Sequence, residues 1–99
     1  MNISDAEFKA EVAHVVRLYE KAIGHAASYT WPMIDNYGEV EALSRLVVSA
    51  KLQKGFKVLR DSGQLDKTFE ALVVRFPHLF RPEVVQSAQW RLDHPYDLL

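Results

Sequence analysis

The sequence predicts an all-α fold, a compact single-domain bundle of five or six short helices within its 99 residues. Apolar residues recur every three or four positions along most of the chain, which is the spacing of one helix face. Glycine and proline divide the second half into short segments, at Gly63-Gln64-Leu65 and at Phe76-Pro77-His78. A hydrophobic share of 48% supplies enough apolar surface for one core. No two segments alternate in the manner of paired strands.

The first helix is the longest and is expected over about 5–27. Ser4 and Glu7 have the spacing of a capping box, and Ile3 and Phe8 occupy the two positions of a hydrophobic staple. The predicted buried face consists of Phe8, Val12, Val15, Val16, Tyr19 and Ile23. A glycine near its end can terminate this helix, but the alanines that follow allow it to continue.

Two shorter helices are expected at about 31–37 and 39–49. Thr30 can cap the first of them, and a proline in its first turn costs no hydrogen bond. Gly38 separates the two, because glycine readily adopts the left-handed conformation that follows a last turn. The buried stripe of the second consists of Val40, Leu43, Leu46 and Val47.

A fourth helix is expected at about 51–62, ending at Gly63. Its apolar stripe consists of Leu52, Phe56 and Leu59. Gly55 lies beside this stripe, where the lack of a side chain allows another helix to approach closely.

The fifth helix is expected at about 66–76, capped by Asp66 and ended by Pro77. Its core face consists of Phe69, Leu72, Val73 and Phe76. The connector that follows is short and apolar, and we expect Phe80 to anchor it in the core.

The sixth helix is expected at about 82–93, with Pro82 at its first position and a tail at 94–99. Its predicted buried face consists of Val84, Val85, Ala88 and Leu92.

Composition excludes several classes of function. The formal net charge of −1 argues against a dedicated polyanion binder, and the absence of cysteine excludes disulfides and thiolate chemistry. The first residues lack the basic and apolar stretches of a signal peptide, and no apolar run is long enough to span a membrane. We therefore expect a cytoplasmic protein with no membrane partner.

No catalytic, metal or cofactor site is predicted. The four histidines lie on distant helix turns or beside prolines and have no metal-binding spacing: His14, His25, His78 and His94. No serine lies in a nucleophile turn, and no glycine-rich loop suits a phosphate. The carboxylates are expected on solvated faces, so the chain is not expected to be an enzyme.

A basic stretch on the fourth helix is one candidate surface. Lys51, Lys54, Lys57 and Arg60 are expected, with Gln53, on the side opposite the apolar stripe. They are interpreted as a solvated helix face, as a surface that steers an acidic protein, or as an anion or nucleic-acid face.

The fourth and fifth helices resemble a DNA-reading helix-turn-helix only weakly. The predicted exposed side of the fifth carries Lys67, Glu70, Ala71, Val74 and Arg75, and no amide side chain for reading base edges.

Trp90 defines the second candidate surface. On the sixth helix it points away from the apolar face and shares its side with Gln86 and Glu83. A tryptophan on a polar face is an attractive anchor for a protein partner. Two alternatives remain: the first helix or the tail covers it, or a second copy of the chain does.

One pattern resembles the last part of small bacterial helical domains with an E-A-L-V…L-F…A-x-x-R-L arrangement. It is carried by Phe69-Glu70-Ala71-Leu72-Val73-Val74, Leu79-Phe80, Ala88 and Arg91-Leu92, with Tyr37-Gly38-x-Val40-Glu41-Ala42 and Leu65-Asp66 upstream. The resemblance covers roughly 37–92 and implies a recurring bacterial domain, with no activity attached.

The sequence therefore predicts a non-enzymatic protein-interaction module, an adaptor, regulator or inhibitor that occupies a partner surface. The alternative is a nucleic-acid-binding accessory protein that uses the basic face at 51–60.

Overall fold

The all-α prediction is confirmed. The computed structural model describes residues 5–50 and 52–98, and within these ranges the chain forms six α-helices, two short 3₁₀ turns and no strand. In chain order the elements are α1 (Asp5–Ile23), α2 (Thr30–Tyr37), α3 (Glu39–Val48), α4 (Lys54–Asp61), η1 (Leu65–Lys67), α5 (Phe69–Arg75), η2 (Pro77–Leu79) and α6 (Pro82–Asp93). Within the described ranges, no helix combines the length and the apolar character that crossing a bilayer requires.

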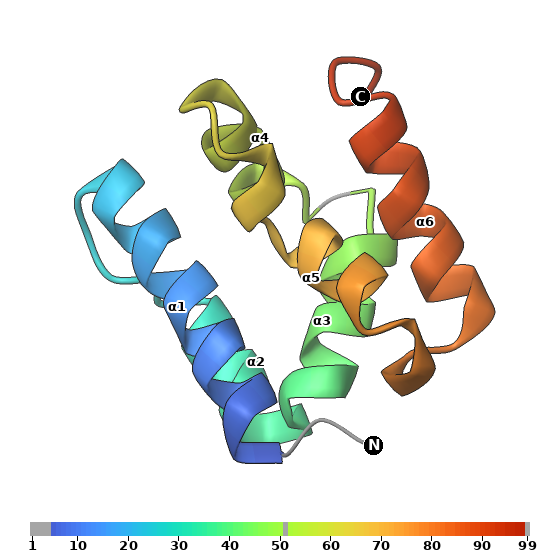
Figure 1. Ribbon diagram of the computed structural model, residues 1–99. Helices are drawn as coiled ribbons and strands as arrows, with labels where there is room; N and C mark the ends of the chain where they lie inside the picture. Colours follow the sequence, from blue (N-terminus) through green and yellow to red (C-terminus); the bar gives the residue numbers. More distant parts are fainter. Residues whose placement is uncertain (1–4, 51, 99) are drawn as a thin grey trace.

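The short helix α5 lies near the middle of the molecule, with α1 on one side and α6 on the other (Figure 1). It packs most closely against α6 and also contacts α1 and α3. Helix α4 packs on α1, and α3 packs on both α2 and α6. The overall dimensions are 34 × 28 × 21 Å.

The core is built from most of the apolar stripes that the sequence indicates, although Val40, predicted in the buried stripe of α3, is 38% exposed. Phe8, Val12, Val15 and Val16 of α1 are buried, as predicted, and Phe80 is buried in the connector before α6. The Phe8 ring meets the rings of Phe76 and Phe80 edge-on, with centroids 5.8 Å and 6.1 Å away. The most deeply buried larger side chains are Leu43, Leu59, Leu72, Val12, Val16, Val47, Val73, Val84 and Thr68. Burial of these stripes is the main force that holds the short helices together.

Helix α1 is shorter than the predicted range of about 5–27. It ends at Ile23 because Gly24 takes a left-handed φ of 78° and its amide donates to the Glu20 carbonyl at 2.8 Å. The predicted capping box and staple depend on Ser4 and Ile3, which lie outside the described residues.

Three further predictions about helix ends are wrong. Thr30 is the first residue of α2 rather than its cap, and no side chain caps that helix. Helix α4 begins at Lys54, three residues later than predicted. Asp66 lies in η1, whereas Thr68 caps α5, accepting from the Ala71 amide at 3.1 Å and donating to the Leu65 carbonyl at 2.8 Å. A threonine can do both because its hydroxyl is a donor and an acceptor.

Two glycine turns are confirmed, with φ of 81° at Gly38 and 75° at Gly63. Pro82 occupies the first position of α6, also as predicted.

Candidate functional site

A buried ion pair joins three helices. Arg91 on α6 and Glu70 on α5 are only 5% and 4% exposed, and Nη1 of Arg91 donates to Oε2 of Glu70 at 2.7 Å. Arg91 also donates to the Leu46 carbonyl at 3.2 Å and to the Ser49 carbonyl at 2.7 Å. These carbonyls lie at the C-terminal end of α3, where helix carbonyls lack partners within the helix. Arg91 therefore links α3, α5 and α6.

Glu70 contradicts the expectation that the carboxylates are solvated and that this residue lies on the exposed side of its helix. Removal from water raises the pKa of the Glu70 carboxyl, against the opposing hydrogen bond and charge of Arg91. The sequence did indicate that Arg91 is buried, because this residue follows Val84 and Ala88 at the spacing of the apolar face. A charge on such a face requires a buried partner. Leu92, predicted there, is only half-buried.

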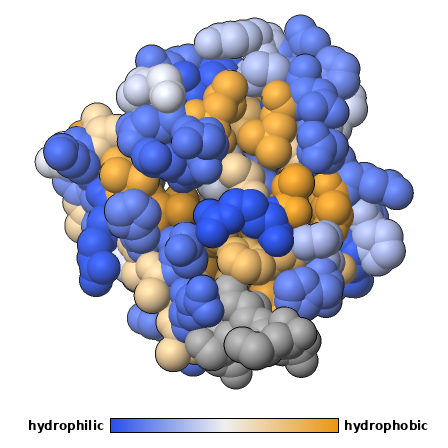
Figure 2. Space-filling model, in the orientation of Figure 1, coloured by the Kyte–Doolittle hydropathy of each residue, from blue (hydrophilic) through white to orange (hydrophobic). Residues whose placement is uncertain are grey.

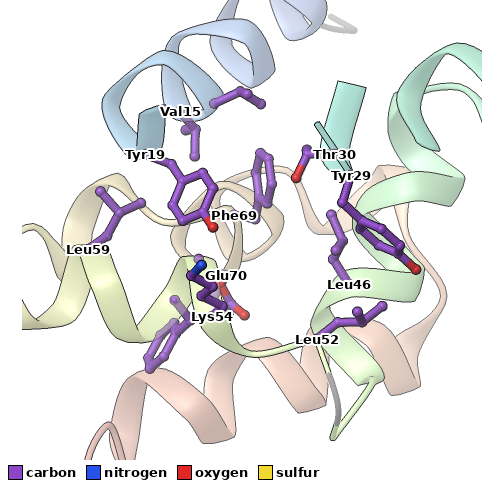
Figure 3. Close-up of a pocket in the computed structure, with 13 residues that line it drawn as sticks. Val15, Tyr19, Tyr29, Thr30, Leu46, Leu52, Lys54, Leu59, Phe69 and Glu70 are labelled. Atoms are coloured by element: carbon purple, nitrogen blue, oxygen red, sulfur yellow. The ribbon is translucent and has the colours of Figure 1, made fainter. Parts of the chain in front are cut away.

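The first of two hollows, here called the apolar pocket, has a volume of about 290 Å³. It is bounded by α1, α4 and α5, by Leu46 of α3 and by the start of α2, and Figure 3 shows its walls. Its lining consists of Val15, Val16, Tyr19, Tyr29, Thr30, Leu46, Leu52, Lys54, Gly55, Phe56, Leu59, Phe69 and Glu70. On the face shown in Figure 2, hydrophobic atoms reach the surface in separate groups between polar side chains.

Helix α4 packs on α1 near Gly55, but this packing does not depend on the missing side chain that the sequence singles out. A Cβ built there would lie 3.9 Å from the ring of Tyr19, which is ordinary van der Waals contact. The packing brings the neighbouring Lys54 to the same side of the pocket as Tyr19, as Figure 3 shows.

The second hollow, here called the Trp90 hollow, has a volume of about 200 Å³. Its lining consists of Val47, Val48, Ala50, Gln53, Ser87, Trp90 and Arg91. Gln53 is only 9% exposed, and its Oε1 has no hydrogen-bond partner among the described residues. A buried acceptor without a partner is unusual, since nearly all buried polar groups are hydrogen-bonded.

Trp90 is 48% exposed at the edge of this hollow. Its ring stacks on that of His94, with centroids 4.6 Å apart and an angle of 20° between the planes. His94 is itself fixed, because both its amide and its Nδ1 contact the Trp90 carbonyl, at 2.9 Å and 3.0 Å. The indole is therefore held in one orientation although half of it faces solvent.

The ion pair separates the two hollows. Glu70 lines the apolar pocket and its partner Arg91 lines the Trp90 hollow. The same division runs along the chain from α3 to α4, where Leu52 faces the pocket and the adjacent Gln53 faces the hollow.

The candidate surface around Trp90 lies together on α6. Trp90, Gln86 and Glu83 are all exposed and follow one another at helical spacing. Glu83 is paired with Arg81, whose Nε lies 2.9 Å from its Oε1. His94, the first residue of the predicted tail, covers one face of Trp90, whereas Pro95 and Tyr96 contact Arg60 instead.

The basic candidate surface is divided. Lys51 lies outside the described residues, and Lys54 borders the apolar pocket. Arg60 donates to Asp61 and to the Pro95 carbonyl, both at 2.8 Å, and lies over the Tyr96 ring. The Arg60 hydrogen bond lowers the pKa of the Asp61 carboxyl.

Two residues of the predicted basic face do not lie where the sequence predicts them. Lys57 is half-buried, and Gln53, predicted beside the cations, is buried in the Trp90 hollow. Of the three described cations of this face, Lys54 is exposed, whereas Lys57 and Arg60 are half-buried.

Comparisons with protein-family models, with curated proteins and with solved structures gave no match to this chain. Among residues 5–50 and 52–98, no group of three or more histidine, aspartate or glutamate side chains is arranged to hold a metal ion. Functional arguments for this protein therefore start from its two hollows. Sequence reasoning located Trp90 but missed the pocket, the ion pair and the position of Gln53.

Proposed function

We propose that this chain is a non-enzymatic protein-interaction module of the cytoplasm, an adaptor, regulator or inhibitor that docks through its Trp90 surface. This surface comprises Trp90, Gln86 and Glu83 with the adjoining Trp90 hollow. The observation that carries the proposal is a half-exposed indole held rigid by His94, beside a hollow whose Gln53 acceptor has no partner among the described residues.

The rigid indole supports an anchoring role on energetic grounds. Tryptophan is enriched among the few residues that carry most of the binding energy of an interface. Binding costs less when the anchoring side chain is already ordered, because less rotamer freedom is lost. Stacking on His94 orders the Trp90 ring before any partner arrives.

The hollow restricts the chemistry of the partner. Gln53 lines the hollow and its buried Oε1 lacks a partner among the described residues, so a group that donates a hydrogen bond, such as a backbone amide or a hydroxyl, suits this hollow once the amide turns toward it. Val47 and Val48 also line the hollow and allow an apolar stem next to that donor. A protein segment satisfies both conditions.

The test is capture from a lysate with three tagged baits, followed by affinity measurement on the purified partner. The baits are the natural chain, Trp90→Ala and the control Tyr37→Ala, since Tyr37 is 49% exposed and lies outside both hollows. We expect one protein to be retained by the natural chain and by Tyr37→Ala. Trp90→Ala should weaken its binding by about 2 kcal/mol or more, roughly 30-fold.

Two further experiments test the nucleic-acid and homodimer alternatives. Captures are repeated with nuclease and at raised salt, because a phosphate-based contact is lost under those conditions whereas a Trp90 contact persists. Sedimentation of the chain alone tests for a homodimer and shows whether Trp90→Ala dissociates it. Capture that needs nucleic acid, or that is equal for the natural chain and Trp90→Ala, overturns the proposal.

A further inference from the structure

The apolar pocket has the character of a small-molecule site rather than of a packing gap. Its volume of about 290 Å³ lies close to the lower end of the roughly 300–1,000 Å³ typical of ligand pockets. Most of its lining is aliphatic or aromatic, with only a few polar groups among them. Pockets that bind small molecules combine apolar walls with a few converging polar groups in this way.

Two hydrogen-bond donors converge on one side of the pocket. Lys54 and Tyr19 both line the pocket, and Figure 3 shows the amine and the hydroxyl on the same side of it, with Glu70 beside the amine in this view. Among the described residues, Lys54 has no ion pair and the Tyr19 hydroxyl has no hydrogen-bond partner. Burial raises the pKa of Tyr19, so at neutral pH the hydroxyl keeps the proton that it can donate.

The balance of charge selects the sign of a ligand. Glu70 also lines the pocket, but its carboxylate is paired with Arg91 at 2.7 Å. The uncompensated charge of the lining is therefore the positive charge of Lys54. A ligand amine would be repelled by it, and a neutral alcohol would leave it without a counterion.

We propose that the apolar pocket binds a small amphipathic monocarboxylate, such as a medium-chain fatty acid. Its carboxylate lies between Lys54 and the Tyr19 hydroxyl, and its tail lies along the side chains of Leu46, Leu52 and Phe69. The ion pair with Lys54 and the hydrogen bond from Tyr19 hold the head group at the solvent side. Burial of the tail supplies most of the affinity, since each buried methylene contributes about 0.8 kcal/mol of transfer free energy.

The chain contains a convenient reporter for this site. Gly55 lines the pocket, whereas Gly24, Gly38 and Gly63 do not. Glycine amides resonate in a sparse region of a ¹H–¹⁵N correlation spectrum, so one signal reports on the pocket and three serve as internal controls. The probe is sodium octanoate, with octanol and octylamine as neutral and cationic matches of the same chain length.

We expect octanoate to shift the Gly55 amide in a saturable manner and to leave the other three glycine amides nearly unchanged. Octanol should bind more weakly and octylamine more weakly still. Lys54→Gln should weaken the binding of octanoate roughly two- to fivefold, which is the effect expected from the loss of an exposed ion pair. Lys54→Glu should reverse the preference in favour of octylamine.

Lys57→Gln is the matched control, because Lys57 lies on the same helix and does not line the pocket. Octanoate affinity should be unchanged in Lys57→Gln and in Trp90→Ala. This keeps failure of the ligand proposal distinguishable from failure of the docking proposal.

Three results would overturn the inference. These are a Gly55 amide that does not respond to octanoate at millimolar concentration, an affinity for octanol equal to that for octanoate, and an octanoate affinity that Lys54→Gln leaves unchanged. The first result would favour an apolar protein side chain as the occupant, and the other two would show a cavity with no selection of the head group.

Discussion

The two hollows share a wall and differ in almost everything else. The apolar pocket is lined by α1, α4 and α5 and exposes a cation and a hydroxyl at its edge. The Trp90 hollow is lined by α3, α6 and the segment between α3 and α4, and it encloses an acceptor without a described partner. Glu70 faces the first and Arg91 faces the second. Because the two charges of this pair neutralise each other, the different chemistry of the two hollows comes from their other lining residues.

The largest effect on stability should come from disrupting the ion pair between the two hollows. Arg91→Leu leaves the Glu70 carboxylate buried without a counterion and removes the donors to the Leu46 and Ser49 carbonyls. Loss of one member of a buried pair costs about 3–5 kcal/mol, a large fraction of the roughly 5–15 kcal/mol typical of a domain. Urea denaturation followed by circular dichroism measures the change.

The control for that experiment is Arg45→Leu, which removes an exposed pair with Glu41 and should cost less than about 1 kcal/mol. Adding Glu70→Leu to Arg91→Leu should recover part of the loss, because the unpaired charge is then gone. A loss below about 1 kcal/mol in Arg91→Leu would show that water reaches Glu70.

A second prediction concerns the Trp90 hollow alone. Gln53→Met keeps a side chain of similar length and removes the acceptor that lacks a partner among the described residues. We expect the free energy of unfolding to rise by about 1 kcal/mol, because an unsatisfied buried polar group costs about 1–3 kcal/mol. The exposed Gln86→Met should stay within about 0.5 kcal/mol. Destabilisation by Gln53→Met would mean that the acceptor is satisfied in solution.

The third prediction concerns the apolar pocket alone. Gly55→Ala places a methyl group 3.9 Å from the Tyr19 ring, in ordinary van der Waals contact, and its backbone needs no left-handed conformation. Removing a glycine from a helix should stabilise the fold by about 0.5 kcal/mol. Gly63→Ala is the contrasting control, since space is available there but φ is 75°, and it should destabilise by about 1 kcal/mol. Thermal unfolding of both variants tests the pair.

The smallest effect concerns the connection between α1 and α2 and depends on pH. Oε2 of Glu20 accepts from the Ala27 amide and from Nε1 of Trp31, both at 2.8 Å, and so ties α1 to the start of α2. These hydrogen bonds, the Ala27 one foremost, lower the pKa of Glu20 below its usual 4.5. Their contribution is present above pH 4.5 and is lost as the pH falls through the lower pKa of the folded state.

Glu20→Gln should therefore be less stable than the natural chain at pH 7, and the difference should shrink as the pH falls to about 3. Denaturation curves at a series of pH values measure that difference. A stability difference that stays constant, or that increases in acid, would show that ionisation of Glu20 is not coupled to folding.

The helices themselves could be predicted from local sequence. The stripe from Phe8 to Val16 and the turns at Gly38 and Gly63 depend on spacing and on backbone freedom, and both are properties of a few consecutive residues. Helix ends were less predictable. Thr68 rather than Asp66 caps α5, because the choice depends on where the chain enters from η1.

Spacing also placed Trp90 opposite the apolar face of α6, but it left open whether another part of the chain covers this residue, and only the structure shows it 48% exposed. The same reasoning failed for Glu70 and Gln53, because polarity alone places both on the surface. Each is buried by contacts with residues distant in the sequence: Glu70 pairs with Arg91, and Gln53 lies against α3 and α6.

The sequence by itself thus determined the helical class, most of the core stripes and the polar face of α6. Only the tertiary structure decided the two hollows, the ion pair between them and the place of Lys54 and Tyr19 in the lining of one pocket. The physical reason is that a helix face depends on neighbours within four residues, whereas a cavity and a buried charge pair depend on how separate helices pack.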